Sequence, residues 1–466
     1  MIPYPAYKST NLPWLPKIPK HWGIVRCKQI FRPIDVRSEK GEEQLLSVSE
    51  RHGVVKREQA NVTMFKAASY EGYKLCWPDD LAINSLWAWS YGLGFSPYHG
   101  IISTAYSVFR LKDKTKYLPR FYDYLVRSKD FHWELRVRSK GLWKSRYQLS
   151  DDAFLAAPIL DVPIAEQEQI VRYLDSMTAK INKLIRAKKK QIALLQEQRQ
   201  AIINQAVTKG LDPNAEMKDS GIDWLGKIPN HWTMNKVGHF YRSILGKMLA
   251  SSQTDSTYTY EKYLCAKDVH FSGVDLSDPK EMWFSPEEKW KYRIKAGDLL
   301  VVEGGAGAGG AAVFMGSEDE LYIQNSIHCI RPKSNKVSVH FLYYWLYALV
   351  GRKYIDYACN KATIPHFTGD KLFEMPFVLV PISEQNAIVN HLEEVCRKYD
   401  SVIDKLKGEI NLANEYKNSL ISSVVTGQTD VRNIPVEDVI PDDLIPEDDP
   451  TAEIEEEPPT PEESEE

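Results

Sequence analysis

The chain has 466 residues, enough for two or three domains, and its hydrophobic content of 43% is ordinary for a globular protein. The formal net charge of -4 conceals two parts of opposite sign, because residues 437–466 hold 15 Asp and Glu and no Lys or Arg. Residues 1–436 hold the other 48 acidic residues and all 59 basic ones, so they carry a formal charge of +11. A basic body indicates a polyanionic partner; the acidic tail either discourages unspecific contacts or only aids solubility.

The six cysteines are scattered without paired spacing, which argues against a zinc site or a disulfide framework and fits a reducing compartment. The N-terminus lacks the basic and apolar regions of a signal peptide. The longest apolar run, residues 341–350, is too short to span a bilayer. We therefore expect a soluble, cytoplasmic protein.

The first globular segment, residues 1–161, contains short apolar runs that predict strands at 44–48, 81–83 and 106–109 and a helix at 118–127. The next segment, 162–212, has no Gly or Pro from residue 164 until Gly210. Its apolar residues recur mostly at steps of three and four, which predicts a long helix that buries one stripe. The positions expected to pair are Leu174, Met177, Ile181, Leu184, Ile192, Leu195 and Ile202.

The same order follows again in the second half of the chain. Residues 213–379 predict strands at 299–302 and 327–330 and a helix at 339–349, and residues 380–430 predict a second long helix. Its pairing positions are Leu392, Val395, Tyr399, Val402, Leu406, Ile410 and Leu420. The acidic segment 431–466, rich in Pro, Asp and Glu, is expected to be disordered.

These similarities are an internal repeat. Residues 14–22 recur as 224–232, and the two long helical patterns superimpose at one constant offset, which places Leu174 on Leu392. We call positions related by that offset equivalent. Residues 8–212 and 218–430 are thus two copies of one unit, a globular part followed by a long helix. Two helices with one shared pattern can satisfy each other's apolar stripes. The predicted fold class is α+β, with two pseudo-symmetric globular α/β parts and two long helices.

Three charged residues interrupt the apolar stripes: Lys188 and Arg199 in the first helix and Lys417 in the second. They either extend along an exposed edge or control the register of the helices. Glu166 and Glu384 fall in the first turns, where a carboxylate suits the helix dipole.

The glycine-rich run 304–310 lacks the Lys-Ser or Lys-Thr ending of a P-loop, and no dinucleotide-binding fingerprint accompanies it. It is either a flexible loop or a loop that touches nucleic acid. The matching place in the first copy, residues 85–94, carries aromatic residues instead. Two domains that recognise different nucleic-acid sequences would show such an exchange of residues. Two loops whose sequences diverged without a functional effect would show it as well.

Residues 140–148 and 360–367 occupy matching places and mix cations, amides, imidazole and aromatic rings. Cations can neutralise phosphates, while Arg, Gln, Asn and His can pair with base edges; a solvated surface loop is the alternative. The candidates for DNA contact are Trp87, Trp89, Tyr91, Lys144, Arg146, Gln148, Gly305, Gly307, Asn325, Lys361, Thr363 and His366.

The pairs His21-Trp22 and His231-Trp232 invite a catalytic interpretation, but their identical setting after Ile-Pro in both copies favours a structural corner. The sequence contains no Ser-His-Asp arrangement, metal-ligand cluster or Asn-Pro-Pro-aromatic motif that stands out. The chain is therefore expected to bind a partner without a reaction centre or metal site of its own.

The repeated Trp-Leu…Lys-Ile-Pro…His-Trp entry, the Pro-Ile-Ala-Glu-Gln and Pro-Ile-Ser-Glu-Gln helix starts and the exit at residues 205–211 resemble the specificity (S) subunit of type I restriction-modification enzymes, the HsdS family. The resemblance covers nearly all of residues 8–430. It implies target recognition domains at 1–161 and 213–379, each reading one half of an asymmetric bipartite site in double-stranded DNA. It also implies that the helices 162–212 and 380–430 pair antiparallel as a coiled-coil spacer.

In that family, two modification (methyltransferase) subunits dock on the pseudo-two-fold body, and restriction subunits with nuclease and translocase activity join the complex. S-adenosylmethionine, ATP and magnesium belong to those partners, so the resemblance implies no cofactor on this chain and no enzymatic activity by itself. The alternative is a coiled-coil scaffold that binds only proteins. A stand-alone nuclease or methyltransferase lacks its motifs here.

Overall fold

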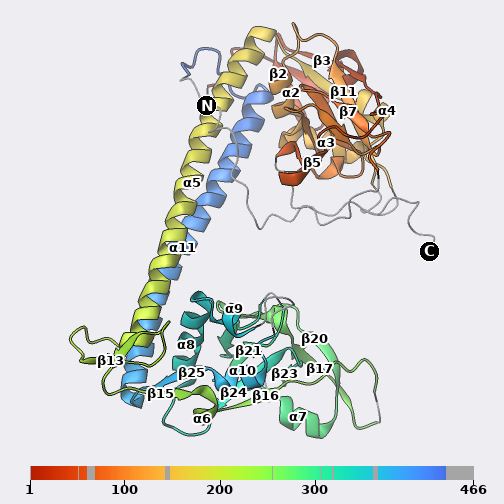
Figure 1. Ribbon diagram of the computed structural model, residues 1–466. Helices are drawn as coiled ribbons and strands as arrows, with labels where there is room; N and C mark the ends of the chain where they lie inside the picture. The colour runs from red at the N-terminus through yellow and green to blue at the C-terminus, as the bar shows by residue number, and fades with distance from the viewer. Residues whose placement is uncertain are drawn as a thin grey trace. The chain divides into compact units, whose positions relative to one another are not determined.

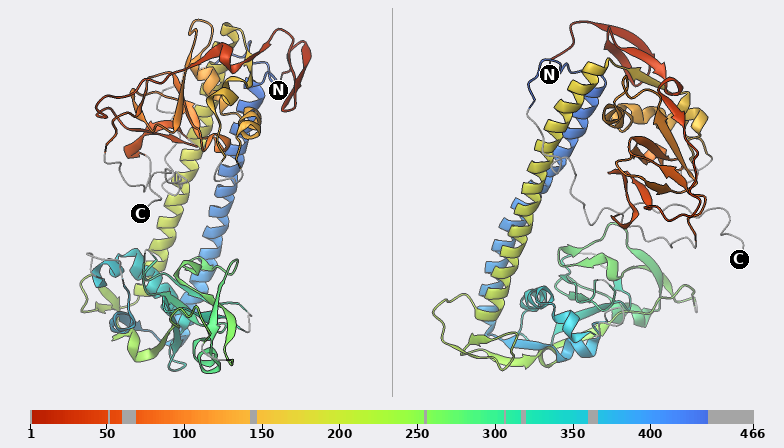
Figure 2. Two further views of the ribbon diagram at one scale, coloured as in Figure 1. Left: turned by 90° about the vertical axis from the view of Figure 1, so that its right-hand side faces the viewer. Right: turned by 45° about the horizontal axis from the view of Figure 1, so that its top comes forward.

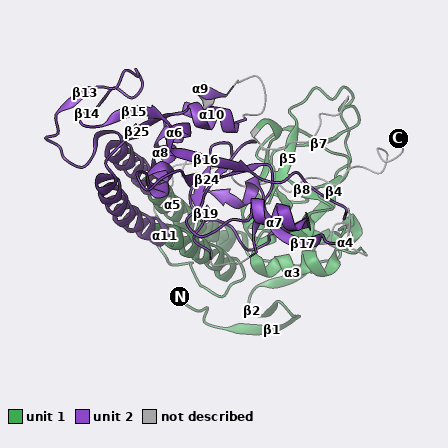
Figure 3. Cartoon of the chain, turned by 90° about the horizontal axis from the view of Figure 1, so that it is seen from below, with its two compact units in different colours: residues 1–190, 406–466 green, residues 191–405 purple. Residues whose placement is uncertain are grey.

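The computed structural model describes residues 2–50, 52–59, 69–141, 147–253, 256–305, 307–316, 320–359 and 366–436 (Figure 1). The chain divides into two compact units (Figure 3). Unit 1 comprises Met1–Lys190 and Leu406–Glu466, and unit 2 comprises Gln191–Lys405. Each unit therefore holds one globular part and a stretch of both long helices.

Unit 1 begins with a mostly β globular part. Its elements are β1 (Tyr7–Leu12), β2 (Leu15–Pro19), β3 (Gly23–Arg26), α1 (Cys27–Ile30), β4 (Phe31–Pro33), β5 (Leu46–Ser49), β6 (Gly53–Lys56), η1 (Arg57–Gln59), β7 (Lys74–Cys76), β8 (Asp80–Asn84), η2 (Ala88–Ser90), β9 (Leu93–Phe95), β10 (Gly100–Ile102), β11 (Tyr106–Leu111), α2 (Pro119–Val126), α3 (Lys129–Arg138), α4 (Asp151–Leu155) and β12 (Pro158–Asp161).

The globular part of unit 2 repeats the frame with other insertions. Its elements are β13 (Met217–Asp219), β14 (Lys227–Pro229), β15 (Thr233–Lys236), α6 (Val237–Phe240), β16 (Tyr241–Leu245), β17 (Thr259–Leu264), η4 (Ala266–Asp268), β18 (Val269–His270), β19 (Gly273–Val274), β20 (Lys280–Phe284), α7 (Pro286–Tyr292), β21 (Leu299–Val302), β22 (Ala311–Val313), β23 (Tyr322–Ile323), β24 (Ile327–Pro332), α8 (Val339–Gly351), α9 (Tyr354–Ala358), α10 (Gly369–Glu374) and β25 (Pro376–Leu379).

A four-stranded antiparallel sheet forms the centre of each globular part, in the orders β4-β11-β8-β9 and β16-β24-β21-β22. The strands predicted at 81–83, 106–109, 299–302 and 327–330 are its central pairs, so those predictions are confirmed. They are short apolar runs because most of their residues are buried.

The central sheet of each unit contains an Asp-Arg ion pair whose carboxylate is buried. Arg110 donates to Asp80 from Nε and Nη2 at 2.6 and 2.8 Å, and Arg331 donates to Asp298 from the same atoms at 2.7 and 2.6 Å. Each carboxylate also accepts a backbone N–H from the turn before its strand. Such bidentate, fully hydrogen-bonded pairs are structural, and they explain the aspartate that the two copies share.

The entry to each long helix is built twice in the same way. The strand before the helix pairs with the strand after the His-Trp dipeptide, β12 with β3 and β25 with β15. Glu166 accepts a hydrogen bond from Trp22 Nε1 at 2.9 Å and lies 2.5 Å from His21 Nε2. Glu384 repeats both contacts with Trp232 and His231, at 3.1 and 2.8 Å. The prediction of a structural corner agrees with these contacts.

The glutamine that follows each glutamate is fully buried and joins three segments. The side-chain amide of Gln167 donates to the carbonyls of Lys116 and Val162 and accepts from Leu118 N. Gln385 makes the same three bonds with Lys336, Val380 and Ser338. The Glu-Gln dipeptide thus binds the globular part to the first turn of the helix in each unit.

The two long helices are α5 (Ile164–Lys209) and α11 (Ile382–Val425). Each starts directly after a proline and ends near a glycine with positive φ, Gly210 at 75° and Gly427 at 73°. Only glycine adopts that conformation readily, so it terminates the helix. No helix among the described residues is long and apolar enough to cross a membrane.

Within each unit, stretches of α5 and α11 lie side by side and antiparallel, as the fold class predicted (Figures 1 and 2). In unit 1 the buried seam includes Leu174, Ile181 and Leu420, and in unit 2 it includes Leu392. Met177, Ile410 and Ile202 pack against these cores while remaining partly exposed. Ile192, Leu195, Val395, Tyr399 and Leu406 are partly buried on the helices.

Two residues that were predicted to lie in the buried seam are exposed instead. Leu184 is 48% exposed and Val402 is 45% exposed, whereas their neighbours Ile185 and Ile403 are 9% and 4% exposed. The register predicted from the sequence was wrong by a single position at both places, which are equivalent in the repeat. A step of four from Ile181 to Ile185 follows the period of 3.6 over the next turns better than a step of three.

All three charged residues that interrupt the stripes bind across the helix pair. In unit 2, Arg199 forms an ion pair with Asp400 and donates to Tyr347 Oη; in unit 1, Lys417 donates to Asn182 Oδ1 at 3.2 Å. Asn182 is equivalent to Asp400 and Arg199 to Lys417, so the same cross-helix contact is made once in each unit. These contacts, with an ion pair between Lys188 and Glu409, favour register control over the exposed-edge alternative.

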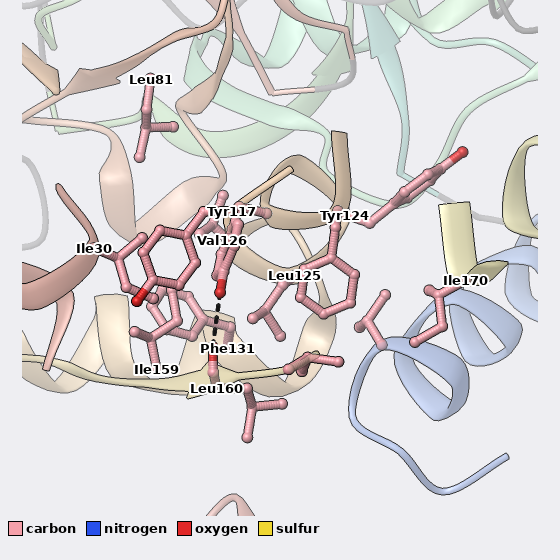
Figure 4. Close-up of a cluster of buried hydrophobic side chains, with 14 of the residues drawn as sticks. Ile30, Leu81, Tyr117, Tyr124, Leu125, Val126, Phe131, Ile159, Leu160 and Ile170 are labelled. Carbon is pink, nitrogen blue, oxygen red and sulfur yellow. Dashed lines mark hydrogen bonds between the residues drawn. The ribbon is translucent and has the colours of Figure 1, made fainter. Parts of the chain in front are cut away.

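Each unit has a main core to which its stretch of long helix contributes. In unit 1, Figure 4 shows Leu125 and Phe131 from the helices gathered with Ile159, Leu160 and Ile170, and a tyrosine hydroxyl bonded within the cluster. That bond runs from Tyr122 Oη to the Leu160 carbonyl at 3.1 Å. The long helices are therefore integral to the globular parts that they support.

Candidate nucleic-acid interface

The two predicted loop regions of each globular part meet at the end of its central strand. In unit 1, Leu149 N donates to the Ser85 carbonyl at 2.9 Å, just past β8. In unit 2, Phe367 N donates to the Glu303 carbonyl at 2.6 Å, just past β21. Leu149 is equivalent to Phe367, and Ser85 to Glu303. In unit 1 this bond brings residues 85–94 beside residues 140–141 and 147–148, and in unit 2 it brings residues 303–305 and 307–310 beside residues 366–367. We call these two places the surfaces of unit 1 and unit 2.

The surface of unit 1 is aromatic. Trp87 and Trp89 stack at 5.6 Å between ring centroids, and Tyr147 meets Trp89 edge-on at 6.0 Å. Trp89 Nε1 is held by the Leu86 carbonyl at 2.9 Å. Both indoles are partly exposed, so they present rigid apolar surface beside the loop that follows. Rings of this kind can contact thymine methyl groups or stack on unpaired bases.

Tyr91, the third aromatic candidate, is held from α3. Its ring stacks on His132 at 3.9 Å with an angle of 8°, and His132 Nε2 lies 2.5 Å from the Trp89 carbonyl. Burial lowers the pKa of His132 and raises the pKa of Tyr91. A neutral imidazole therefore supports the loop. The sequence analysis missed His132, and no repeat or motif marks it.

Gln148 is exposed, and its backbone pairs with Lys140 through two hydrogen bonds of 3.0 Å. The predicted contact residues Lys144 and Arg146 lie outside the described residues, as do Lys361 and Thr363 in unit 2.

The counterpart surface in unit 2 is small and polar. Gly304 forms a backbone bridge with His366, whose side chain is exposed. Gly305 has a φ of 85° and open space where a Cβ would stand, and Gly307 is exposed. Asn325, on a neighbouring turn, donates its backbone N–H to the Lys247 carbonyl at 2.8 Å. The structure thus joins Gly305 and His366 in one surface and leaves an open approach to the backbone.

A buried polar cluster underlies each surface, and its chemistry differs between the units. In unit 1, Ser107 binds Asp151 and lies 3.2 Å from Ser85. In unit 2, His328 Nδ1 lies 3.0 Å from Ser243 Oγ, and His328 Nε2 lies 3.7 Å from Glu303 Oε2. The sequence analysis missed these residues, although Ser85 and Glu303 are equivalent positions of the repeat.

Burial shapes the ionisation of the cluster in unit 2. His328 is 3% exposed, and burial lowers its pKa to about 4, while burial raises the pKa of Glu303. His328 Nε2 has no hydrogen-bond partner among the described residues. The buried imidazole thus supports Glu303, the residue at the start of the glycine-rich loop. In the part of the chain that the structure describes, no group of His, Cys, Asp and Glu residues could hold a metal ion.

The outer faces of the long helices expose apolar residues in related pairs. Besides the equivalent Leu184 and Val402, the equivalent residues Leu194 and Leu412 are exposed by 49% and 66%. Exposed apolar side chains at equivalent positions are what two copies of one partner would contact.

Comparison with known proteins shows which proteins this chain is similar to. Residues 229–412 match the model of the type I restriction modification DNA specificity domain. The specificity subunit of the type I restriction enzyme StySPI from Salmonella potsdam is 23% identical over 278 residues, which are 58% of each protein. The EcoKI specificity subunit from Escherichia coli K12 is 22% identical over 277 residues, 57% of this chain and 56% of that protein. The matched part thus spans somewhat more than half of these relatives.

A solved structure agrees in fold. A chain described in a study of complex assembly and conformational transition of the type I R-M system superimposes with a TM-score of 0.63 at 17% sequence identity. The match covers 88% of this chain and 99% of that one. The repeated frame and both long helices therefore have a known structural counterpart.

Proposed function

Because this chain belongs to the family of DNA specificity subunits of type I restriction-modification systems, we propose that it reads an asymmetric, bipartite site in double-stranded DNA. One globular part reads each half of the site. The chain carries no catalytic centre for this task and acts as the non-catalytic part of a restriction and methylation complex. It works in the cytoplasm.

One observation carries the proposal above all. The same backbone junction, from Leu149 to Ser85 and from Phe367 to Glu303, holds surfaces of different chemistry. A frame kept twice with unlike loops suits a molecule whose two ends must recognise unlike sequences. We assign the reading of one half-site to Trp87, Trp89, Tyr91 and Gln148, with Lys144 and Arg146. We assign the other to Gly305, Gly307, Asn325 and His366, with Lys361 and Thr363.

We further propose that two methyltransferase subunits dock on the helices, and that restriction subunits join through them. The paired exposed residues Leu184 with Val402 and Leu194 with Leu412 support two equivalent docking sites. S-adenosylmethionine, ATP and magnesium are then bound by those partners and not by this chain.

The test is selection from randomised duplex DNA by the full chain, with and without a methyltransferase partner. We expect enrichment of a split motif with two unlike halves and a fixed gap. No enrichment even with the partner would favour a protein-binding scaffold, and methylation by the chain alone would mean that it is an enzyme.

Two variants assign the halves. Trp87→Ala with Trp89→Ala should relax or change one half of the motif and leave the other half intact. His366→Ala should affect only the half that the first variant spares, so each variant is the control for the other. A variant that weakens both halves equally would contradict the division of labour.

A further inference from the structure

Helix α3 is joined to the surface of unit 1 by three contacts. The ring of Tyr91 stacks on His132 of α3, and His132 Nε2 lies 2.5 Å from the Trp89 carbonyl. Just beyond the end of α3, the backbone of Lys140 pairs with that of Gln148. The helix and the surface of unit 1 are therefore fixed against each other.

One side of α3 is exposed and carries cations. Lys129, Trp133 and Arg136 are exposed and follow each other at steps of four and three, which places them on one face of the helix. Trp133 is 38% exposed, and Val137, one turn after it, is 57% exposed. We call these four residues the α3 face. It combines two positive charges with apolar side chains that no core covers.

The acidic residues of α3 are held away from the α3 face. Glu134 is 3% exposed and accepts hydrogen bonds from Trp14 Nε1 at 2.8 Å and Arg138 Nε at 2.7 Å. Asp130 accepts a hydrogen bond from Ser422 of α11. In the part of the chain that the structure describes, neither cation of the α3 face has an ion-pair partner. Both charges are thus available to an anion in solution.

The stability of the helix does not account for these cations. Lys129 is the first residue of α3, where the helix dipole disfavours a positive charge. Arg136 suits the last turn, but its charge also acts on the surface of unit 1. Burial raises the pKa of Tyr91, and the charge of Arg136 opposes that shift. Burial lowers the pKa of His132, and Arg136 lowers it further.

One strand of a duplex fits this arrangement. The two cations lie about 10 Å apart along the helix axis, at about 1.5 Å per residue, and three base pairs rise by about the same distance. Trp133 lies between them, where it can contact the sugars. We propose that Lys129 and Arg136 bind phosphates of one strand next to the half-site that unit 1 reads. They fix the position of the duplex against Trp87 and Trp89, and this assignment rests on the function proposed above.

The salt dependence of binding to random-sequence duplex DNA tests the phosphate contacts. Lys129→Gln with Arg136→Gln should reduce the slope of log K against log salt by about 2. Lys129→Arg with Arg136→Lys keeps both charges and should keep the slope. Lys20→Gln with Lys28→Gln, exposed cations of unit 1 outside α3, should change it little. Because all these side chains are exposed, each variant should keep the urea midpoint of the unchanged chain.

Uncharged linkages in the DNA locate the contacts. In a duplex that carries the selected motif, methylphosphonates replace the phosphates beside one half sequence at a time. Beside the half that Trp87→Ala with Trp89→Ala alters, they should weaken binding of the unchanged chain more than binding of the Lys129→Gln, Arg136→Gln variant. Beside the other half, they should weaken both proteins equally. Selection with the variant should return the same two half sequences, because phosphate contacts carry no sequence information.

The other outcomes decide against the proposal. An unchanged slope, or an equal loss in the Lys20 and Lys28 control, would mean that α3 does not bind the duplex. A changed base preference would mean that Lys129 or Arg136 reads a base edge. Normal DNA binding with loss of the methyltransferase partner would make the α3 face a protein interface. If the unchanged chain selects no motif, the proposed reading function fails, and the slope on random-sequence DNA still decides whether α3 binds phosphates.

Discussion

At the scale of single residues, the repeated His-Trp and Glu-Gln dipeptides are parts of one joint. The sequence could predict a structural corner from their identical settings, but it could not predict the partners. Glu166 seemed suited to the helix dipole, yet it also binds Tyr4, His21 and Trp22, which lie near the start of the chain. Such contacts depend on how segments that are distant in the sequence pack together, and a local sequence pattern does not predict them.

Glu166→Ala should therefore destabilise unit 1. The variant leaves the Trp22 indole N–H and the Tyr4 hydroxyl buried without an acceptor, which costs about 1–3 kcal/mol. The measurement is the urea concentration at the midpoint of unfolding, with tryptophan fluorescence as the signal. Glu168→Ala, an exposed neighbour in the same turn, should leave the midpoint nearly unchanged. Equal effects of the two changes would show that the joint adds no stability.

His328 should make unit 2 sensitive to acid. Its folded pKa of about 4 lies below the usual 6.5, so the unfolded chain binds more protons between these values. The contribution of the neutral His328 to the free energy of unfolding is therefore fully present above pH 6.5. It falls by up to about 3 kcal/mol as the pH drops towards 4. The contribution is measured as the difference in denaturant stability between pH 7 and pH 4.5.

Two neighbours of this imidazole belong in the experiment. Glu303 and Ser243 face it, and Glu303 takes up a proton more readily than an exposed glutamate because burial raises its pKa. His328→Gln should reduce the loss of stability on acidification, whereas Glu303→Gln should leave the His328 contribution in place. An NMR titration of His328 with a pKa near 6.5 would contradict the expectation.

At the scale of elements, the sequence predicted the long helices and most of their seam but chose the wrong member of two adjacent apolar pairs. The pairs are Leu184 with Ile185 and Val402 with Ile403. Either member of each pair could face the core, and periodicity alone does not distinguish them. The choice depends on where the opposite helix lies. The polar contacts of Arg199 and Lys417 fix that register, and their partners could not be read before the helices were paired.

The seam correction can be tested directly. Ile185→Ala removes a buried side chain and should cost about 2–4 kcal/mol, whereas Leu184→Ala should cost less than about 1 kcal/mol. Ile403→Ala and Val402→Ala repeat the comparison in unit 2. Denaturant unfolding of the four variants gives the result, and a larger loss for Leu184 or Val402 would restore the original register.

At the scale of the whole molecule, the repeat was the most informative signal in the sequence. The repeated motifs predict the paired joints, the paired sheets and the helix ends, because duplicated frames must satisfy the same packing twice. They give no information on the loops, whose roles require them to differ. His132 supports one of those loops, and Ser243 and His328 support the other, through tertiary contacts that no sequence motif marks.

If the helices set the distance between two reading surfaces, their length should fix the gap in the DNA site. Inserting four residues into both helices should change the recognised spacing and leave each half sequence unchanged. Selection from randomised duplexes and footprinting measure both quantities. An unchanged gap would reject the idea that the helices act as a ruler, and insertion into only one helix serves as a disruptive control.

The residues after α11 are held by hydrogen bonds from two sides. Gln169 Nε2 donates to the Val431 and Ile434 carbonyls at 3.1 and 2.8 Å, and Asp430 N donates to the Ile2 carbonyl at 2.7 Å. The beginning of the chain thus lies against the residues that follow α11, just as residues 210–218 connect the first copy to the second. A gene rearranged to start near residue 218 and to join residue 436 to residue 2 through a short linker would encode a circular permutant. Duplication of an ancestral half-gene would account for both connections at once, and we expect such a permutant to fold because residues 2 and 430 already adjoin.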